Sequence, residues 1–155
     1  MSYTFSTSRE IAASASEVFA AISNPERFAR WWGPAGFTNT FHVCEFKPGG
    51  RWSFVMHGPD GANYDNENVF EQIEAPYRVV IRHVNEPLFT LRIELKATAS
   101  GTLVAWEQVL DNAELAAQIA HIIEPANEQN LDRLTIEVLS QQRATKASAS
   151  DVPKV

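Results

Sequence analysis

Apolar and polar residues alternate in several short stretches between residues 3 and 110. The clearest stretch places Phe89, Leu91 and Ile93 on one side and Thr90 and Arg92 on the other, which is typical of a half-buried β-strand. Comparable patterns predict strands at residues 3–11, 37–46, 52–57, 63–73, 77–84, 89–95 and 102–110. Because turn residues separate most of these stretches, successive strands are expected to pair in antiparallel fashion.

Helical periodicity occurs at both ends of the chain. Ser14 followed by Glu17 forms a capping-box pattern ahead of a short helix, and Asn24 with Pro25 predicts the start of a second one. After residue 112, apolar residues recur every three or four positions, which predicts a long amphipathic helix up to residue 141. Pro125 is expected to interrupt or restart this helix.

The order of these elements predicts an α+β fold. A curved antiparallel sheet of about seven strands would wrap around the long C-terminal helix, with two short helices after the first strand. Residues 1–141 are expected to form a single domain, and the Ala-, Ser- and Lys-rich segment 142–155 a disordered tail. The aromatic content suggests a cavity between sheet and helix, although periodicity alone also permits a filled core.

Composition excludes some classes of partner. The chain is 45% apolar and 21% charged, with a formal net charge of −6, and no basic stripe is visible. Neither nucleic acid nor an anionic membrane surface is therefore an expected partner. Cys44 is the single cysteine, and the sequence shows neither a signal peptide nor an apolar run of roughly 18 residues. These features predict a cytoplasmic protein without an internal disulfide.

Two aromatic segments, 30–37 and 47–52, suggest the wall of a cavity. Two adjacent tryptophans beside a Gly-Pro turn cannot both enter one small core, so Trp32 is expected to line the mouth while Trp31 is buried. The alternative is that this run only plugs one end of the fold. The predicted ligand pocket comprises Trp32, Phe37, Trp52, Phe54, Met56, Arg82, Leu91, Ile93, Trp106, Gln108 and His121.

The polar members of this set have alternative interpretations. Arg82 could orient a carboxylate or carbonyl in the pocket, or it could form an ion pair with Glu107 at the sheet surface. His121 could face the cavity or the solvent. No catalytic set stands out, since no nucleophile elbow is present and a thiol role for Cys44 rests only on His42 nearby. The spacing of the four histidines favours no metal site, and no cofactor is predicted.

Several motifs, in order along the chain, carry a family resemblance. They are Ala15-Ser16-Glu17-Val18-Phe19-Ala20-Ala21, Trp31-Trp32-Gly33-Pro34 with Gly36-Phe37, Pro48-Gly49-Gly50-Arg51-Trp52, Pro59-Asp60-Gly61, Glu71-Gln72-Ile73-Glu74-Ala75-Pro76, Gly101-Thr102 and Asn127-Glu128-Gln129-Asn130-Leu131-Asp132-Arg133-Leu134. With these motifs the chain resembles the SRPBCC (START-like, helix-grip) superfamily. Within it, the chain is most similar to bacterial proteins related to the C-terminal domain of the activator of heat-shock-protein-90 ATPase.

The resemblance implies a seven-stranded antiparallel sheet that grips the C-terminal helix around a deep apolar pocket. It does not imply one activity, because the superfamily includes ligand binders, lipid carriers, polyketide cyclases and chaperone regulators. The polar run Asp65-Asn66-Glu67-Asn68 departs from the usual pattern and argues against a purely lipid-like ligand.

Three functional hypotheses follow. The leading one is a binding module, not an enzyme, with an apolar cavity for a small or medium hydrophobic ligand. The second is a cyclase- or hydrolase-like enzyme acting on an aromatic or polyketide-type substrate, with Arg82, His83, Glu107 or His121 as acid or base. The third, carried by the resemblance alone, is a chaperone-associated interaction domain. The sequence leaves open whether the chain forms a homodimer.

Overall fold

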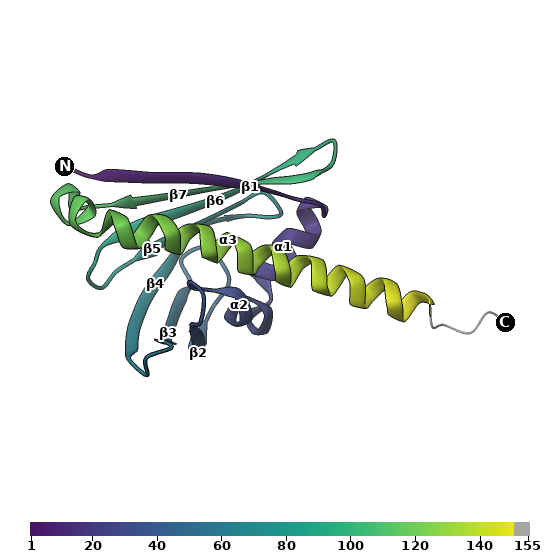
Figure 1. Cartoon of the computed structure of the whole chain (residues 1–155), viewed down its shortest axis with the longest axis horizontal. Helices are drawn as coiled ribbons and strands as arrows, with labels where there is room; N and C mark the ends of the chain where they lie inside the picture. Colours follow the sequence, from purple (N-terminus) through teal and green to yellow (C-terminus); the bar gives the residue numbers. More distant parts are fainter. Residues whose placement is uncertain (151–155) are drawn as a thin grey trace.

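The computed structural model describes residues 1–150, with side chains described to residue 145 (Figure 1). Its elements follow the predicted order of one strand, two short helices, six strands and a long helix. They are β1 (Tyr3–Ile11), α1 (Ala15–Ser23), α2 (Pro25–Trp31), β2 (Thr38–Cys44), β3 (Arg51–His57), β4 (Asn63–Glu74), β5 (Arg78–His83), β6 (Phe89–Thr98), β7 (Gly101–Leu110) and α3 (Ala113–Ser150).

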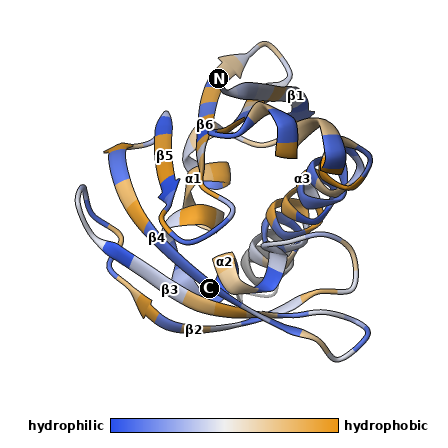
Figure 2. Cartoon of the chain, turned by 90° about the vertical axis from the view of Figure 1, so that its left-hand side faces the viewer, coloured by the Kyte–Doolittle hydropathy of each residue, from blue (hydrophilic) through white to orange (hydrophobic). Residues whose placement is uncertain are grey.

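The strands form one seven-stranded antiparallel sheet in the order β1-β7-β6-β5-β4-β3-β2. Figure 2 shows the sheet curving from β1 to β2 around one side of α3, which lies across the concave face. This arrangement confirms the predicted α+β helix-grip fold. One face of the sheet needs an apolar cover, and the long amphipathic helix supplies it.

The two short helices begin where the capping patterns predict. Ser14 and Glu17 form a reciprocal capping box at α1, and the Asn24 side chain accepts from the N–H groups of Glu26 and Arg27 at α2. Both helices therefore have partners for their first free N–H groups. Both helices contact α3, and Figure 1 shows them near the middle of its length. The aromatic segment that follows α2 therefore lies next to α3.

Aromatic rings fill the core between these helices and the sheet. Trp52 stacks on Phe28, with ring centroids 4.5 Å apart, and on Phe54 at 4.4 Å. Trp31 and Trp106 are also fully buried, and the Trp31 Nε1–H donates to the carbonyl of Ala21 at 2.8 Å. These large rings pack closely against one another between the short helices and the sheet.

The course of α3 differs from the prediction in two respects. The helix continues through Pro125, although proline removes one backbone hydrogen bond, because its packing against the sheet and short helices extends on both sides. It also continues to Ser150, nine residues beyond its predicted end at residue 141. Residues 151–155 lie outside the described part. Within that part, no helix is long and apolar enough to cross a membrane.

Candidate functional site

A cleft of about 700 Å³ opens between the first half of α3 and the ends of strands β3, β4 and β5. Its apolar walls come from the segment after α2, from β3, from the turn between β5 and β6, from β6 and from α3. They comprise Trp32, Pro34, Phe37, Met56, Pro87, Phe89, Ile122 and Ala126. Polar groups also reach the cleft, namely Asn63, Tyr64, Asp65, Asn66, His83, Glu86, Asn127 and Asn130. A volume of this size with mostly apolar walls is typical of small-molecule sites.

Trp32 and Gly33 form the corner where α2 ends and the wall begins. Trp32 is only 9% exposed, packs against Trp52 and Trp106, and still borders the cleft. Gly33 has φ +96°, a conformation that side chains rarely adopt, and a Cβ there would lie 2.9 Å from Met56 Cε. Glycine therefore allows the chain to turn tightly against Met56, which is itself part of the wall.

Three side chains of α3, Gln129, Asn130 and Arg133, hold this corner, and we call them the α3 clamp. Nη1 of Arg133 donates to the carbonyls of Trp32, Gly33 and Pro34 at 2.9–3.0 Å. Its Nη2 donates to the carbonyls of Arg30 and Phe37 at 2.8 and 2.9 Å.

The other two members of the α3 clamp complete the contact. Asn130 donates to the carbonyl of Trp31 at 3.0 Å, and the side-chain oxygen of Gln129 accepts from the Ala35 N–H at 3.1 Å. Burial lowers the pKa of the Arg133 guanidinium. The segment after α2 thus has its backbone carbonyls satisfied by a side-chain cation, which fixes the position of Trp32 and Phe37 at the cleft.

His83 is the most buried ionisable group at the cleft, with 4% of its surface exposed. Its ring stacks on Phe89 at 4.5 Å; Nδ1 lies 2.8 Å from the Pro87 carbonyl and Nε2 lies 2.9 Å from Asn66 Oδ1. Burial lowers the pKa of His83, so the ring is neutral near pH 7. Asn66 Nδ2 donates to the Tyr64 carbonyl at 3.1 Å, which leaves Oδ1 facing the ring. A neutral His83 therefore donates to either this oxygen or the Pro87 carbonyl.

Comparison with known proteins places this architecture in a family. Residues 12–138 match the family model described as Activator of Hsp90 ATPase homolog 1-like protein. The chain belongs to this family. None of the curated proteins matches the sequence.

Solved structures resemble this AHSA1-like protein over almost their whole length. A protein from Nitrosomonas europaea has a TM-score of 0.80 at 19% identity, covering 89% of this chain and 95% of that one. A protein from Arthrobacter aurescens has a TM-score of 0.80 at 23% identity, covering 88% and 86%. An AHSA1-like protein from Aeromonas hydrophila has a TM-score of 0.70 at 23% identity, covering 90% and 94%. At these identities the likeness shows a shared fold.

The eight apolar residues predicted for the pocket of this AHSA1-like protein separate into two groups. Trp32, Phe37 and Met56 line the cleft. Trp52, Phe54, Leu91, Ile93 and Trp106 lie instead in the filled core. Alternation in the sequence identifies the inner face of the sheet, but it does not show which part of that face is covered by stacked rings.

Two predicted polar groups point away from the cleft. Arg82 faces the other side of the sheet and forms a bidentate pair with Asp111, at 2.8 and 2.7 Å, which lowers the pKa of that carboxyl group. Glu107 pairs with Arg92 on the neighbouring strand, not with Arg82. His121 is exposed on α3 and does not line the cleft, because Ile122 occupies the lining position.

Gln108 lies on the inner face beside the cleft, where its side-chain oxygen accepts from Asn127 at 3.1 Å.

Sequence reasoning missed Asn127, together with Ala126 and Asn130, as lining residues. Ile122, Ala126 and Asn130 recur every four positions and so share one helix face. The spacing is visible in the sequence, but a search for large apolar residues at helical spacing passes over alanine and asparagine.

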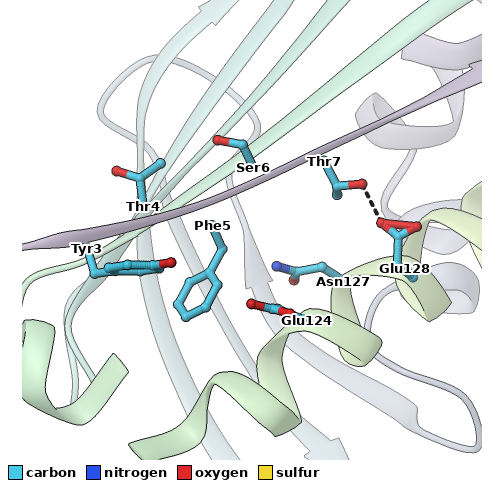
Figure 3. Close-up of a pocket in the computed structure, with 8 residues that line it drawn as sticks. All are labelled: Tyr3, Thr4, Phe5, Ser6, Thr7, Glu124, Asn127 and Glu128. Carbon is cyan, nitrogen blue, oxygen red and sulfur yellow. Dashed lines mark hydrogen bonds between the residues drawn. The ribbon is translucent and has the colours of Figure 1, made fainter. Parts of the chain in front are cut away.

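A second groove, of about 480 Å³, lies on the other side of α3 against β1 (Figure 3). Figure 3 shows Glu124, Asn127 and Glu128 of α3 facing Tyr3, Phe5 and Thr7 of β1, with Thr7 donating to Glu128. Asn127 borders both hollows. The groove has few apolar walls, so we take the cleft on the β3–β5 side as the candidate site.

The thiol of Cys44 is not activated. Burial raises its pKa to about 11, from 9.0 for a free thiol. Among the described residues, no group of three or more His, Cys, Asp or Glu side chains could hold a metal ion. The acid–base groups considered from the sequence also do not converge, since His83 alone of Arg82, His83, Glu107 and His121 reaches the cleft.

Alkylation kinetics test the state of Cys44. Raising a thiol pKa from 9.0 to about 11 lowers the thiolate fraction near neutral pH about a hundredfold. We expect iodoacetamide to alkylate the folded protein at least roughly 50-fold more slowly than the urea-unfolded chain at the same pH. Equal rates in the two states would contradict this account of the thiol.

Proposed function

We propose that this protein binds a small or medium-sized, largely apolar molecule in the cleft between α3 and strands β3–β5. The observation that carries this proposal is the cleft itself, about 700 Å³ with Trp32, Phe37, Met56 and Phe89 on its walls. Burial of an apolar ligand against such walls would contribute roughly 25 cal/mol per Å² of surface removed from water.

The wall of the cleft is held in position before any ligand arrives. The α3 clamp ties the segment bearing Trp32 and Phe37 to the helix that bears Ile122 and Ala126. A preformed site loses less conformational entropy on binding than one that must order its own loops. This supports a binding role for the cleft.

The polar groups would orient the ligand. His83, Asn127 and Asn130 lie at the cleft with part of their hydrogen-bonding capacity directed to protein groups. Both ring nitrogens of His83 face protein groups, the Pro87 carbonyl and Asn66, and no described contact joins the ring to a carboxylate of the cleft. Binding therefore accounts for the arrangement better than a cyclase- or hydrolase-type reaction, which needs a proton donor and acceptor placed together.

A cavity-filling substitution tests the proposal. Ala126→Trp places an indole in the cleft and is expected to weaken binding of the neutral dye Nile red about tenfold or more, because the ligand and the new ring compete for one space. Dye fluorescence during titration measures the affinity.

Ala117→Trp is the matched control. Ala117 is exposed on the same helix, nine residues away and therefore on the opposite face at about 100° per residue. The Ala117→Trp variant should leave the affinity for Nile red unchanged. If Ala126→Trp folds normally by circular dichroism and binds the dye as tightly as the wild type, the dye does not use the cleft and the proposal fails.

A further inference from the structure

The inner wall of the cleft carries polar side chains but, among the described residues, no charged one. Tyr64 pairs with Met56 in the sheet, so both side chains face inward, and Asp65 next to Tyr64 therefore faces outward. Glu86 is exposed in the turn between β5 and β6, at the edge of the cleft. His83 does face inward, but burial lowers its pKa, so the ring is neutral near pH 7.

Two asparagines of α3 bring unused hydrogen-bonding groups to this uncharged wall. Asn130 is only 5% exposed; its Nδ2 donates to the Trp31 carbonyl at 3.0 Å, and no described group donates to its Oδ1. Asn127 Nδ2 donates to Gln108 at 3.1 Å, and its Oδ1 likewise has no described donor. Both asparagines line the cleft. Since residues three apart on a helix are neighbours, with about 5–6 Å between their Cβ atoms, one ligand group can reach either oxygen.

The other polar groups of the inner wall are already engaged with the protein. Both ring nitrogens of His83 face protein groups, and Asn66 Nδ2 donates to the Tyr64 carbonyl. The Tyr64 side chain belongs to a residue that is 48% exposed, so water can reach its hydroxyl group. Of the described side chains, the two asparagines of α3 therefore provide the acceptors that remain for a ligand on the inner wall.

We propose that the cleft selects an uncharged amphiphile whose polar end is a hydroxyl group or an amide N–H, which donates into the pair of side-chain oxygens of Asn127 and Asn130. The apolar part of this ligand lies against Trp32, Met56 and Phe89. This inference rests on the proposed binding function and adds the chemical class of the ligand. An ammonium or carboxylate group would leave water without a counter-charge on this wall, which costs more than desolvating a neutral donor.

Four probes with the same eight-carbon chain test the ligand class. They are 1-octanol, 1-methoxyoctane, octylammonium and octanoate, each titrated at neutral pH and below its solubility limit against protein loaded with Nile red. We expect octanol to bind about fivefold or more tightly than methoxyoctane, although the ether is larger and more apolar, because only the alcohol can donate a hydrogen bond. Both ions should bind at least about tenfold more weakly than octanol.

Asn127→Leu removes one acceptor while largely keeping the size of the side chain. We expect it to lower the ratio of octanol affinity to methoxyoctane affinity about threefold or more. The ratio is the informative quantity, because a general loosening of the cleft would weaken both probes alike. Gln118→Leu is the matched control, since it removes an amide from an exposed position on α3 outside the cleft and should leave the ratio unchanged.

The outcomes separate the two proposals. If octanol displaces the dye no better than methoxyoctane, or if either ion binds as tightly as octanol, the cleft does not select a neutral donor and the inference is wrong. An unchanged ratio in Asn127→Leu also overturns it. In each of these cases the proposed function still stands if Nile red binds and Ala126→Trp weakens that binding. If neither the dye nor any probe binds, the proposed function fails as well.

Discussion

Arg133→Met is expected to lower the free energy of unfolding by at least about 3 kcal/mol, because it removes the guanidinium donor from five backbone carbonyls. Methionine retains much of the apolar stem but cannot donate. Of the α3 clamp, the segment between Arg30 and Phe37 would then keep only the bonds from Asn130 and Gln129, so the cleft should lose affinity for its ligand as well. Urea denaturation followed by tryptophan fluorescence measures the stability, and Nile red titration measures the binding.

Two further variants identify the cause of this loss. Arg133→Lys retains the charge, but a single ammonium group cannot span carbonyls that face two guanidinium nitrogens, so an intermediate loss is expected. Arg143→Met removes an exposed arginine from the same helix and should change stability by less than about 0.5 kcal/mol. If Arg133→Met costs no more than Arg143→Met, the α3 clamp does not stabilise this corner.

Glu137→Gln is expected to cost about 2–3 kcal/mol at neutral pH, because two arginines of α2 lose their counter-charge. The Glu137 side chain is 12% exposed and accepts from Arg27 Nε at 3.0 Å and Arg30 Nε at 2.8 Å. This expectation lies below the usual cost of breaking a fully buried pair, since the Arg30 side chain is 55% exposed. Urea denaturation gives the difference from the wild type.

The same substitution should change how stability depends on pH. Burial by itself would raise the pKa of Glu137, but hydrogen bonds and charges from Arg30 and Arg27 lower it below its usual 4.5. A carboxyl group with a lowered folded-state pKa stabilises the fold above its unfolded-state pKa, and this contribution is lost as the pH falls through the folded-state value. The gap between wild type and Glu137→Gln should therefore narrow as the pH falls from about 7 to below about 4.

Glu124→Gln provides the reference for these measurements. Glu124 is exposed on α3, and no ion pair involves it among the described side chains. Its substitution should change stability by less than about 0.5 kcal/mol at either pH. A gap for Glu137→Gln that stays constant or widens in acid would show that the arginine pairs do not set the ionisation of this carboxyl group.

The α3 clamp illustrates what the sequence showed and what it concealed. Both partners, Trp31-Trp32-Gly33-Pro34 and the Asn130–Arg133 region, were recognisable as motifs. Their contact was not, because the acceptors are backbone carbonyls, which every residue carries alike. The side-chain donors could therefore be identified from the sequence. Their acceptors could not, because these depend on the path of the backbone after α2.

The strand from Arg78 to His83 shows a second limit. Alternation requires Arg82 and His83 to face opposite sides of the sheet, and the sequence alone left open which of them faces inward. In the structure His83 pairs with Phe89 across β5 and β6 and stacks on its ring, while Arg82 pairs with Asp111 outside. The register between the strands determines which of the two side chains faces inward, because a shift by one residue would move every side chain of the strand to the opposite face of the sheet.

The sequence by itself determined the order of the elements, the helix starts at Ser14 and Asn24, and the helix-grip class, since local capping, periodicity and turn chemistry act over a few residues. The tertiary structure alone decided where the cavity ends and which groups face it. Stacked rings fill the space next to Trp52 and Trp106, and the open space lies where Asn66, His83 and Ala126 meet. Such a boundary depends on how bulky side chains from distant segments pack together, and no local pattern records that.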